Sequence, residues 1–99
     1  MGTHLEINKS AIGKFCQNNH IRKLAFFGSV LRDDFSPSSD VDVLVEFEEG
    51  HKPGLRFFDI EAELSAMLGS KVDLNTLEFL SRYFRDSVKK EAEVQYAAP

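Results

Sequence analysis

The hydrophobic positions of this chain follow helical spacing in some segments and strand spacing in others. Apolar residues at intervals of three and four predict helices over about residues 8–17, 55–68 and 77–92. Compact or alternating apolar runs predict strands over about residues 22–27, 41–47 and 71–75. The tail from Glu93 to Pro99 is expected to be partly frayed. The pattern therefore predicts a domain that mixes helices with a small sheet.

The composition predicts one folded domain over residues 1–99. The 99 residues are 42% hydrophobic and include nine phenylalanines, which suffices for a single modest core and argues against disorder. The formal net charge is −4. Proteins that hold a nucleic-acid backbone usually carry an excess of lysine and arginine, so direct binding to nucleic acid is not expected.

Cysteine, histidine and membrane signals are sparse. Cys16 is the only cysteine, so no intrachain disulfide can form, and its place in the first apolar stripe predicts a buried thiol. The three histidines, His4, His20 and His51, show no ligand spacing, so no zinc site is predicted. Neither a signal peptide nor an apolar run of membrane-spanning length is present, and we expect a cytoplasmic protein.

Candidate chemistry lies between the first two predicted strands. The apolar run before Gly28 stops at a residue that permits a sharp turn and close approach of a ligand to the backbone. Ser29 follows with a hydroxyl, beside backbone N–H groups that suit phosphate oxygens. The strand period of two places Asp40 and Asp42 on one face of the second strand. Two neighbouring carboxylates repel each other, which favours a bound divalent cation such as magnesium.

This segment resembles the motif of the DNA polymerase beta-type nucleotidyltransferase superfamily, and most closely its minimal nucleotidyltransferases. In that branch a strand ends in Phe-Gly-Ser, an Arg follows in the turn, and Ser-Asp-x-Asp opens the next strand. The matching positions are Phe27-Gly28-Ser29, Arg32 and Ser39-Asp40-Val41-Asp42. Val30 and Asp33 stand where many members have a second Arg and a Gly.

The resemblance implies a fold and a set of site residues. The expected fold is the α/β (α+β) nucleotidyltransferase catalytic core, a small mixed sheet of three or slightly more strands with helices packed on one face. A third family carboxylate comes from a later strand, and Asp73 matches it by order. The catalytic and metal-binding residues implied are Asp40, Asp42 and Asp73. The nucleotide-binding residues implied are Gly28, Ser29, Arg32 and Ser39.

The resemblance also implies an activity, cofactors and a partner. The implied reaction is transfer of AMP from ATP to an acceptor hydroxyl, with two Mg²⁺ ions as cofactors. Minimal nucleotidyltransferases of this kind are antitoxins that adenylylate a tyrosine of a HEPN-domain ribonuclease toxin, so a HEPN toxin is the expected partner. Two alternatives stay open: a non-catalytic antitoxin that acts by contact, and transfer to a small molecule. The polar loop at residues 48–54 is expected to be solvated, with closure over a nucleotide as its alternative reading.

Overall fold

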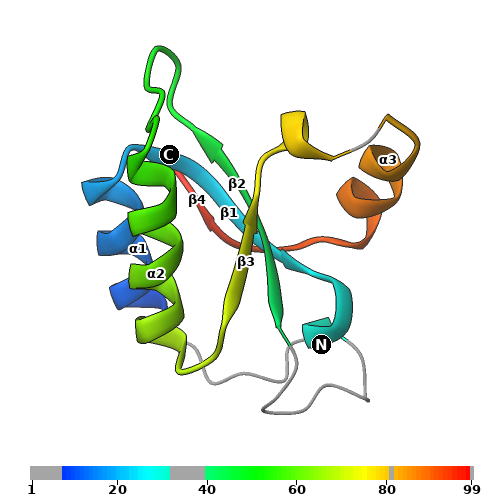
Figure 1. The fold of residues 1–99 in the computed structure, drawn as a ribbon. Helices are drawn as coiled ribbons and strands as arrows, with labels where there is room; N and C mark the ends of the chain where they lie inside the picture. Colours follow the sequence, from blue (N-terminus) through cyan, green and yellow to red (C-terminus); the bar gives the residue numbers. More distant parts are fainter. Residues whose placement is uncertain (1–7, 32–39, 81, 99) are drawn as a thin grey trace.

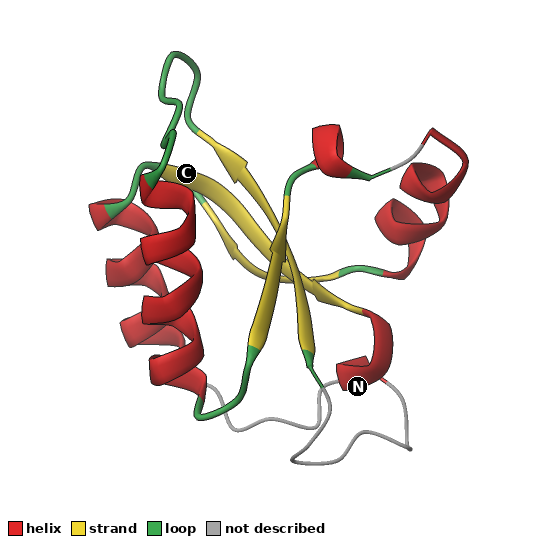
Figure 2. Ribbon diagram, in the orientation of Figure 1, coloured by secondary structure: helices red, strands yellow, loops and turns green. Residues whose placement is uncertain are grey.

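The computed structural model describes residues 8–31, 40–80 and 82–98. Three α-helices and four strands make up most of them (Figures 1 and 2). The helices are α1 (Lys9–Asn18), α2 (Arg56–Leu68) and α3 (Arg82–Glu91), with short 3-10 turns η1 (Gly28–Leu31) and η2 (Leu77–Phe79). The strands are β1 (Ile21–Phe27), β2 (Val41–Phe47), β3 (Val72–Asn75) and β4 (Glu93–Ala97). No described helix has the length and apolar character needed to cross a membrane.

The four strands form one mixed sheet in the order β3-β2-β1-β4. β1 pairs with β2 and with β4 in antiparallel fashion, whereas β2 and β3 are parallel. The parallel pair is joined by α2, as a parallel connection requires a crossover. The α/β class and the mixed sheet predicted for the nucleotidyltransferase core are thus confirmed.

The main core lies between the sheet and the two helices α1 and α2, which cover the same face (Figure 1). Val41, Val43 and Val45 are fully buried there, because the pleat of β2 turns alternate residues to that face. Helix α1 begins where the Asn8 side chain accepts a hydrogen bond from the Ala11 N–H at 3.0 Å. These local signals explain why the predicted bounds of the first two helices agree closely with the structure.

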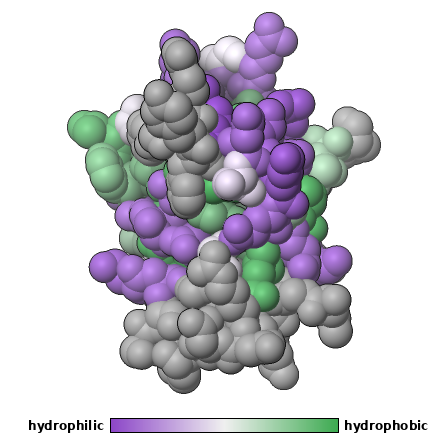
Figure 3. All heavy atoms as spheres, turned by 90° about the vertical axis from the view of Figure 1, so that its right-hand side faces the viewer, coloured by the Kyte–Doolittle hydropathy of each residue, from purple (hydrophilic) through white to green (hydrophobic). Residues whose placement is uncertain are grey.

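The opposite face of the sheet carries a smaller apolar cluster under α3. Its buried members are Phe27, Leu44, Leu80 and Val88. Helix α3 therefore packs on the other side from α1 and α2, so the prediction of helices on one face holds for two of the three (Figure 1). Viewed from the α3 side, the described atoms are mostly hydrophilic with smaller hydrophobic areas between them (Figure 3).

Helix α2 also secures the edge strand β3. The Val72 N–H donates to Ser65 Oγ at 2.9 Å, and the Leu74 N–H donates to Glu61 Oε2 at 2.8 Å. An edge strand exposes unpaired backbone N–H groups, and these two side chains satisfy two of them. The residue between them, Asp73, is therefore held on a strand that is fixed on both sides.

The C-terminal quarter differs from the sequence prediction in two respects. The continuous helix predicted over residues 77–92 is broken, because Leu80 is extended (φ −88°, ψ 141°) between η2 and α3. The tail predicted to fray instead forms β4, which pairs with β1. Arg85 is partly buried, and its Nη2 donates to the Leu80 carbonyl at 3.3 Å. No glycine or proline marks the break, so helical spacing alone could not reveal it.

Candidate functional site

The three predicted carboxylates gather at one end of the sheet. Asp42 and Asp73 are direct neighbours in the parallel ladder between β2 and β3, so their backbones lie about 4.8 Å apart. Asp40 is exposed just before β2, two residues from Asp42. Parallel pairing in this register turns both strand residues to the same face. The fold therefore brings together carboxylates that lie more than thirty positions apart in the sequence.

The turn after β1 adjoins the same carboxylates. Phe27, the last residue of β1, pairs with Asp42, and Gly28 follows with a positive φ of 76°. A Cβ added to Gly28 would lie 2.2 Å from Asp42 Oδ2, well inside van der Waals contact. Only glycine fits both this backbone conformation and this space. The predicted turn and the predicted metal ligand are thus in direct contact.

A fourth carboxylate, which the sequence analysis did not single out, reaches this turn from α3. Glu91, the last residue of α3, accepts a hydrogen bond from the Gly28 N–H through its Oε1 at 2.7 Å. The two residues are 63 positions apart. A single glutamate at the end of a helix gives no pattern that could be recognised in advance.

The remaining predicted nucleotide-binding residues are described only in part. The backbone of Ser29 forms part of η1, directly after Gly28, but its side chain is outside what the structure describes. Arg32 and Ser39 lie outside the described residues. Their roles stay predictions.

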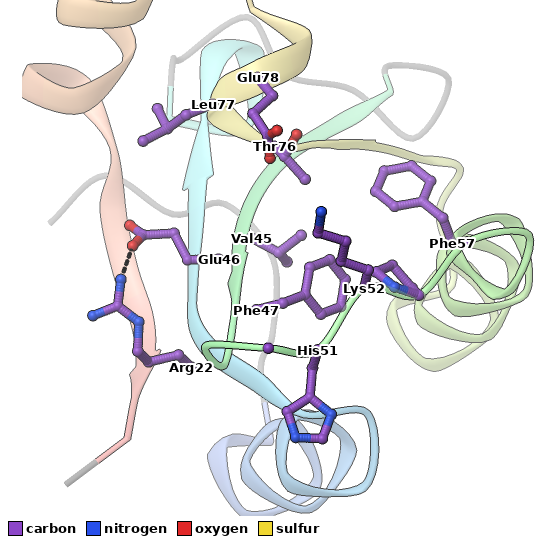
Figure 4. Close-up of a pocket in the computed structure, with 13 residues that line it drawn as sticks. Arg22, Val45, Glu46, Phe47, His51, Lys52, Phe57, Thr76, Leu77 and Glu78 are labelled. Carbon is purple, nitrogen blue, oxygen red and sulfur yellow. Dashed lines mark hydrogen bonds and ion pairs between the residues drawn. The ribbon is translucent and has the colours of Figure 1, made fainter.

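A cavity of about 610 Å³ lies at the other end of β2. It is lined by the end of that strand, the loop at residues 50–54 and the start of η2. Figure 4 shows the Lys52 side chain reaching from the loop into this space, toward Thr76. Five residues of strand, or about 16 Å, separate Asp42 from Phe47 at this end. The loop therefore does not lie beside the carboxylates.

The carboxylate end of the sheet has donors of the kind that suit magnesium. Mg²⁺ prefers oxygen ligands and is usually bound by one or two carboxylates together with water and substrate phosphates. Asp40, Asp42 and Asp73 supply such oxygens, and Gly28 leaves open the space that a Cβ would fill. The residues present thus fit a magnesium ion with a phosphate group beside it.

Comparison with known families decides the identity of the fold. The family model described as nucleotidyltransferase domain matches residues 9–95, which run from the start of α1 into β4. The chain belongs to the nucleotidyltransferase domain family. The family predicted from the motif between Gly28 and Asp42 is therefore confirmed.

Three known proteins show what this nucleotidyltransferase is similar to. Protein adenylyltransferase MntA of Thermococcus cleftensis is 46% identical over 55 residues, which cover 54% of each chain. The matched region is thus about half the length of that relative.

Two solved structures are similar in fold. One is a toxin–antitoxin complex with AMP-PNP, with a TM-score of 0.73 and 21% identity, covering 93% of this chain and 75% of that one. The other is the tri-AMPylated HEPN toxin of Shewanella oneidensis in complex with MNT antitoxin, with a TM-score of 0.64 and 21% identity over 91% of this chain and 70% of that one.

Proposed function

We propose that this nucleotidyltransferase is a protein adenylyltransferase antitoxin that moves AMP from ATP to a tyrosine hydroxyl of a HEPN-domain toxin. The proposal is carried by one end of the sheet, where Asp42 lies beside Gly28 and pairs with Asp73, and Asp40 lies two residues before Asp42. This arrangement joins negative charge for a divalent ion to a turn that lets phosphates approach the backbone. The name of the relative MntA supports the activity, and the similarity to an MNT antitoxin bound to an AMPylated HEPN toxin supports the partner class.

In the proposed reaction, the acceptor oxygen forms a bond to the α-phosphorus of ATP. The bond from that phosphorus to the oxygen of the β-phosphate breaks, and pyrophosphate leaves with the electron pair. Asp73 takes the proton of the acceptor hydroxyl and passes it to water. Asp40 and Asp42, with Asp73, would hold two Mg²⁺ ions, which when bound neutralise the charge of the triphosphate and of the leaving group.

The turn after β1 receives the terminal phosphates in this proposal. Gly28 allows their close approach, and Ser29 and Ser39 supply hydroxyl groups. Arg32 balances part of the phosphate charge. These residues position the triphosphate in line with the acceptor, and positioning together with charge neutralisation supplies most of the catalysis in phosphoryl transfer.

Intact-mass spectrometry of the partner tests this function. The chain is incubated with the protein encoded by its genomic neighbour, ATP and Mg²⁺, and that partner is weighed before and after. We expect one or more AMP groups on the partner and no change when a chelator replaces Mg²⁺. A stable complex in which the partner keeps its original mass would contradict the proposal.

One contact favours a second candidate function, neutralisation of a partner by binding alone. The Glu91 carboxylate accepts the Gly28 N–H at 2.7 Å, in the turn proposed for phosphate. An anionic side chain at this place competes with an anionic ligand for the same amide. If MgATP does not displace the Glu91 carboxylate from the Gly28 N–H, the chain binds its partner without modifying it.

The Glu91→Gln variant separates the two functions. Glutamine retains an oxygen that can accept the Gly28 N–H but carries no charge. If the chain is catalytic, we expect Glu91→Gln to bind MgATP roughly fivefold more tightly than the original chain. Repulsion between one carboxylate and the triphosphate contributes about 1 kcal/mol after solvent screening. Isothermal titration calorimetry measures the change. Glu63→Gln, which removes an exposed carboxylate from α2, is the matched control and should leave the affinity unchanged.

A further inference from the structure

Two of the three histidines in the chain meet at the end of the sheet opposite the carboxylates. His20 lies in the turn between α1 and β1, and His51 lies in the loop between β2 and α2. Their rings are stacked, with centroids 3.9 Å apart and an angle of 8° between the planes. Glu48 completes the group, because its Oε1 is 3.5 Å from His20 Nδ1. No zinc site is predicted from the sequence, because the histidines show no ligand spacing.

Backbone hydrogen bonds hold the three residues together. The Glu48 N–H donates to the His20 carbonyl at 2.8 Å, and the His51 N–H donates to the Glu48 carbonyl at 3.0 Å. These bonds extend the pairing of Ile21 with Phe47 at the end of the β1–β2 ladder. The cluster is therefore built onto the sheet.

The turn that carries His20 is itself firmly anchored. Asn19 is buried, its Nδ2 donates to the Phe15 carbonyl at 2.9 Å, and its Oδ1 accepts from Arg56 Nη2 at 3.0 Å. His20 has a φ of +57°, which is uncommon for a residue other than glycine. Among the described residues it is the single non-glycine residue with a positive φ. A strained backbone that directs a side chain into a cluster is typical of functional positions.

The donor atoms are spaced for a transition metal. One ligand atom from each of His20, Glu48 and His51 lies within 4.8 Å of the others. Tetrahedral zinc with bonds of about 2.0–2.2 Å places its ligand atoms about 3.3 Å apart. The 3.5 Å between His20 Nδ1 and Glu48 Oε1 already matches this spacing. A tilt of the stacked rings would bring the His51 nitrogen to a similar distance from both atoms. The side chains of His20 and Glu48 are 54% and 44% exposed, so they can rotate and an ion can reach them.

We propose that His20, Glu48 and His51 bind one divalent transition-metal ion of the Zn²⁺ or Co²⁺ class. Two imidazoles and one carboxylate form a ligand set that favours these ions over Mg²⁺, which prefers oxygen. A cavity of about 470 Å³ adjoins both histidines and leaves room for water as a further ligand. This site goes beyond the proposed function and does not depend on it.

The single thiol of the chain does not compete for the ion. Cys16 is fully buried, and burial raises the pKa of its thiol to about 12. The thiolate that would bind a soft metal is therefore not formed near neutral pH. The third histidine, His4, lies outside the described residues and serves as the control for loss of a histidine.

The bound ion would link the turn between α1 and β1 to the loop between β2 and α2. Figure 4 shows the His51 side chain directed away from the larger cavity of about 610 Å³, toward the end of α1. An ion held there would tie the turn at His20 to the loop at residues 48–54. Because the ion binds the folded chain and not the unfolded one, it should raise the thermal midpoint.

Metal titration of the untagged full chain tests the proposal. Zn²⁺ binding is measured by calorimetry, and Co²⁺ binding by visible absorption, both with excess Mg²⁺ present to fill the carboxylate site. We expect one ion per chain, Co²⁺ bands typical of nitrogen ligands, and a midpoint raised by several degrees. His51→Ala should weaken Zn²⁺ binding at least tenfold and abolish the rise in midpoint.

Two further variants keep the test decisive. His20→Gly removes the imidazole but suits the positive φ, so it should fold at least as well as the original chain while losing the ion. His4→Ala should bind Zn²⁺ as the original chain does. Equal Zn²⁺ affinity in His51→Ala, His20→Gly and the original chain would overturn the proposal, as would the absence of binding by the original chain.

Discussion

Replacement of Asp42 by asparagine is expected to abolish AMP transfer, with a loss of at least about a hundredfold. Asp42 lies at the centre of the site, paired with Asp73 in one ladder and beneath Gly28. Asparagine keeps the shape of the side chain but removes the charge that a divalent ion requires. MgATP binding should therefore weaken together with transfer, and Asp40→Asn should behave in the same way.

Replacement of the third carboxylate, Asp73, should affect AMP transfer more than it affects MgATP binding. Asp73→Asn is expected to lose most transfer while MgATP binding stays closer to the original value, because the role proposed for Asp73 is mainly at the acceptor oxygen during attack. Calorimetry reports nucleotide binding, intact-mass analysis of the partner reports transfer, and circular dichroism confirms folding. Asp59→Asn, an exposed change on α2, is the control. Transfer by Asp73→Asn at the original rate would show that Asp73 is only a surface residue of β3.

Gly28→Ala is expected to abolish transfer and to lower stability. The new Cβ would lie 2.2 Å from Asp42 Oδ2, so the carboxylate must leave its position. The positive φ of 76° adds strain of about 1–2 kcal/mol for any residue with a Cβ. For a domain of this size, that strain alone corresponds to a fall in thermal midpoint of roughly 5–15 °C.

Gly69→Ala provides a matched control for the effect of strain. Gly69 ends α2 with a φ of 69°, and an added Cβ there would meet nothing within 4 Å. Both alanine variants should therefore lose stability through backbone strain, Gly28→Ala by more because of its clash with Asp42, but only Gly28→Ala should lose transfer. Thermal denaturation and intact-mass analysis of the partner measure the two effects. Normal transfer by Gly28→Ala would contradict the contact between this turn and Asp42, the proposed metal ligand.

Local signals made much of the fold predictable. Asn8 and Gly69 mark the ends of helices through capping, and the alternation along residues 41–47 reproduces the bounds of β2. The motif between Gly28 and Asp42 predicts the nucleotidyltransferase family. Each of these features depends on residues that are close in sequence, where backbone geometry and periodicity restrict the possible structures.

Tertiary structure decided the features that depend on distant segments. β4 forms because the edge of β1 offers unpaired backbone groups, and the helix before it breaks at Leu80, which packs with Phe27 and Leu44. Glu91 reaches Gly28 across 63 positions. The cluster of His20 with Glu48 and His51 likewise exists only because β1 begins beside the end of β2. Such contacts depend on how the sheet and helices pack together, and packing between distant segments leaves no periodic trace in the sequence.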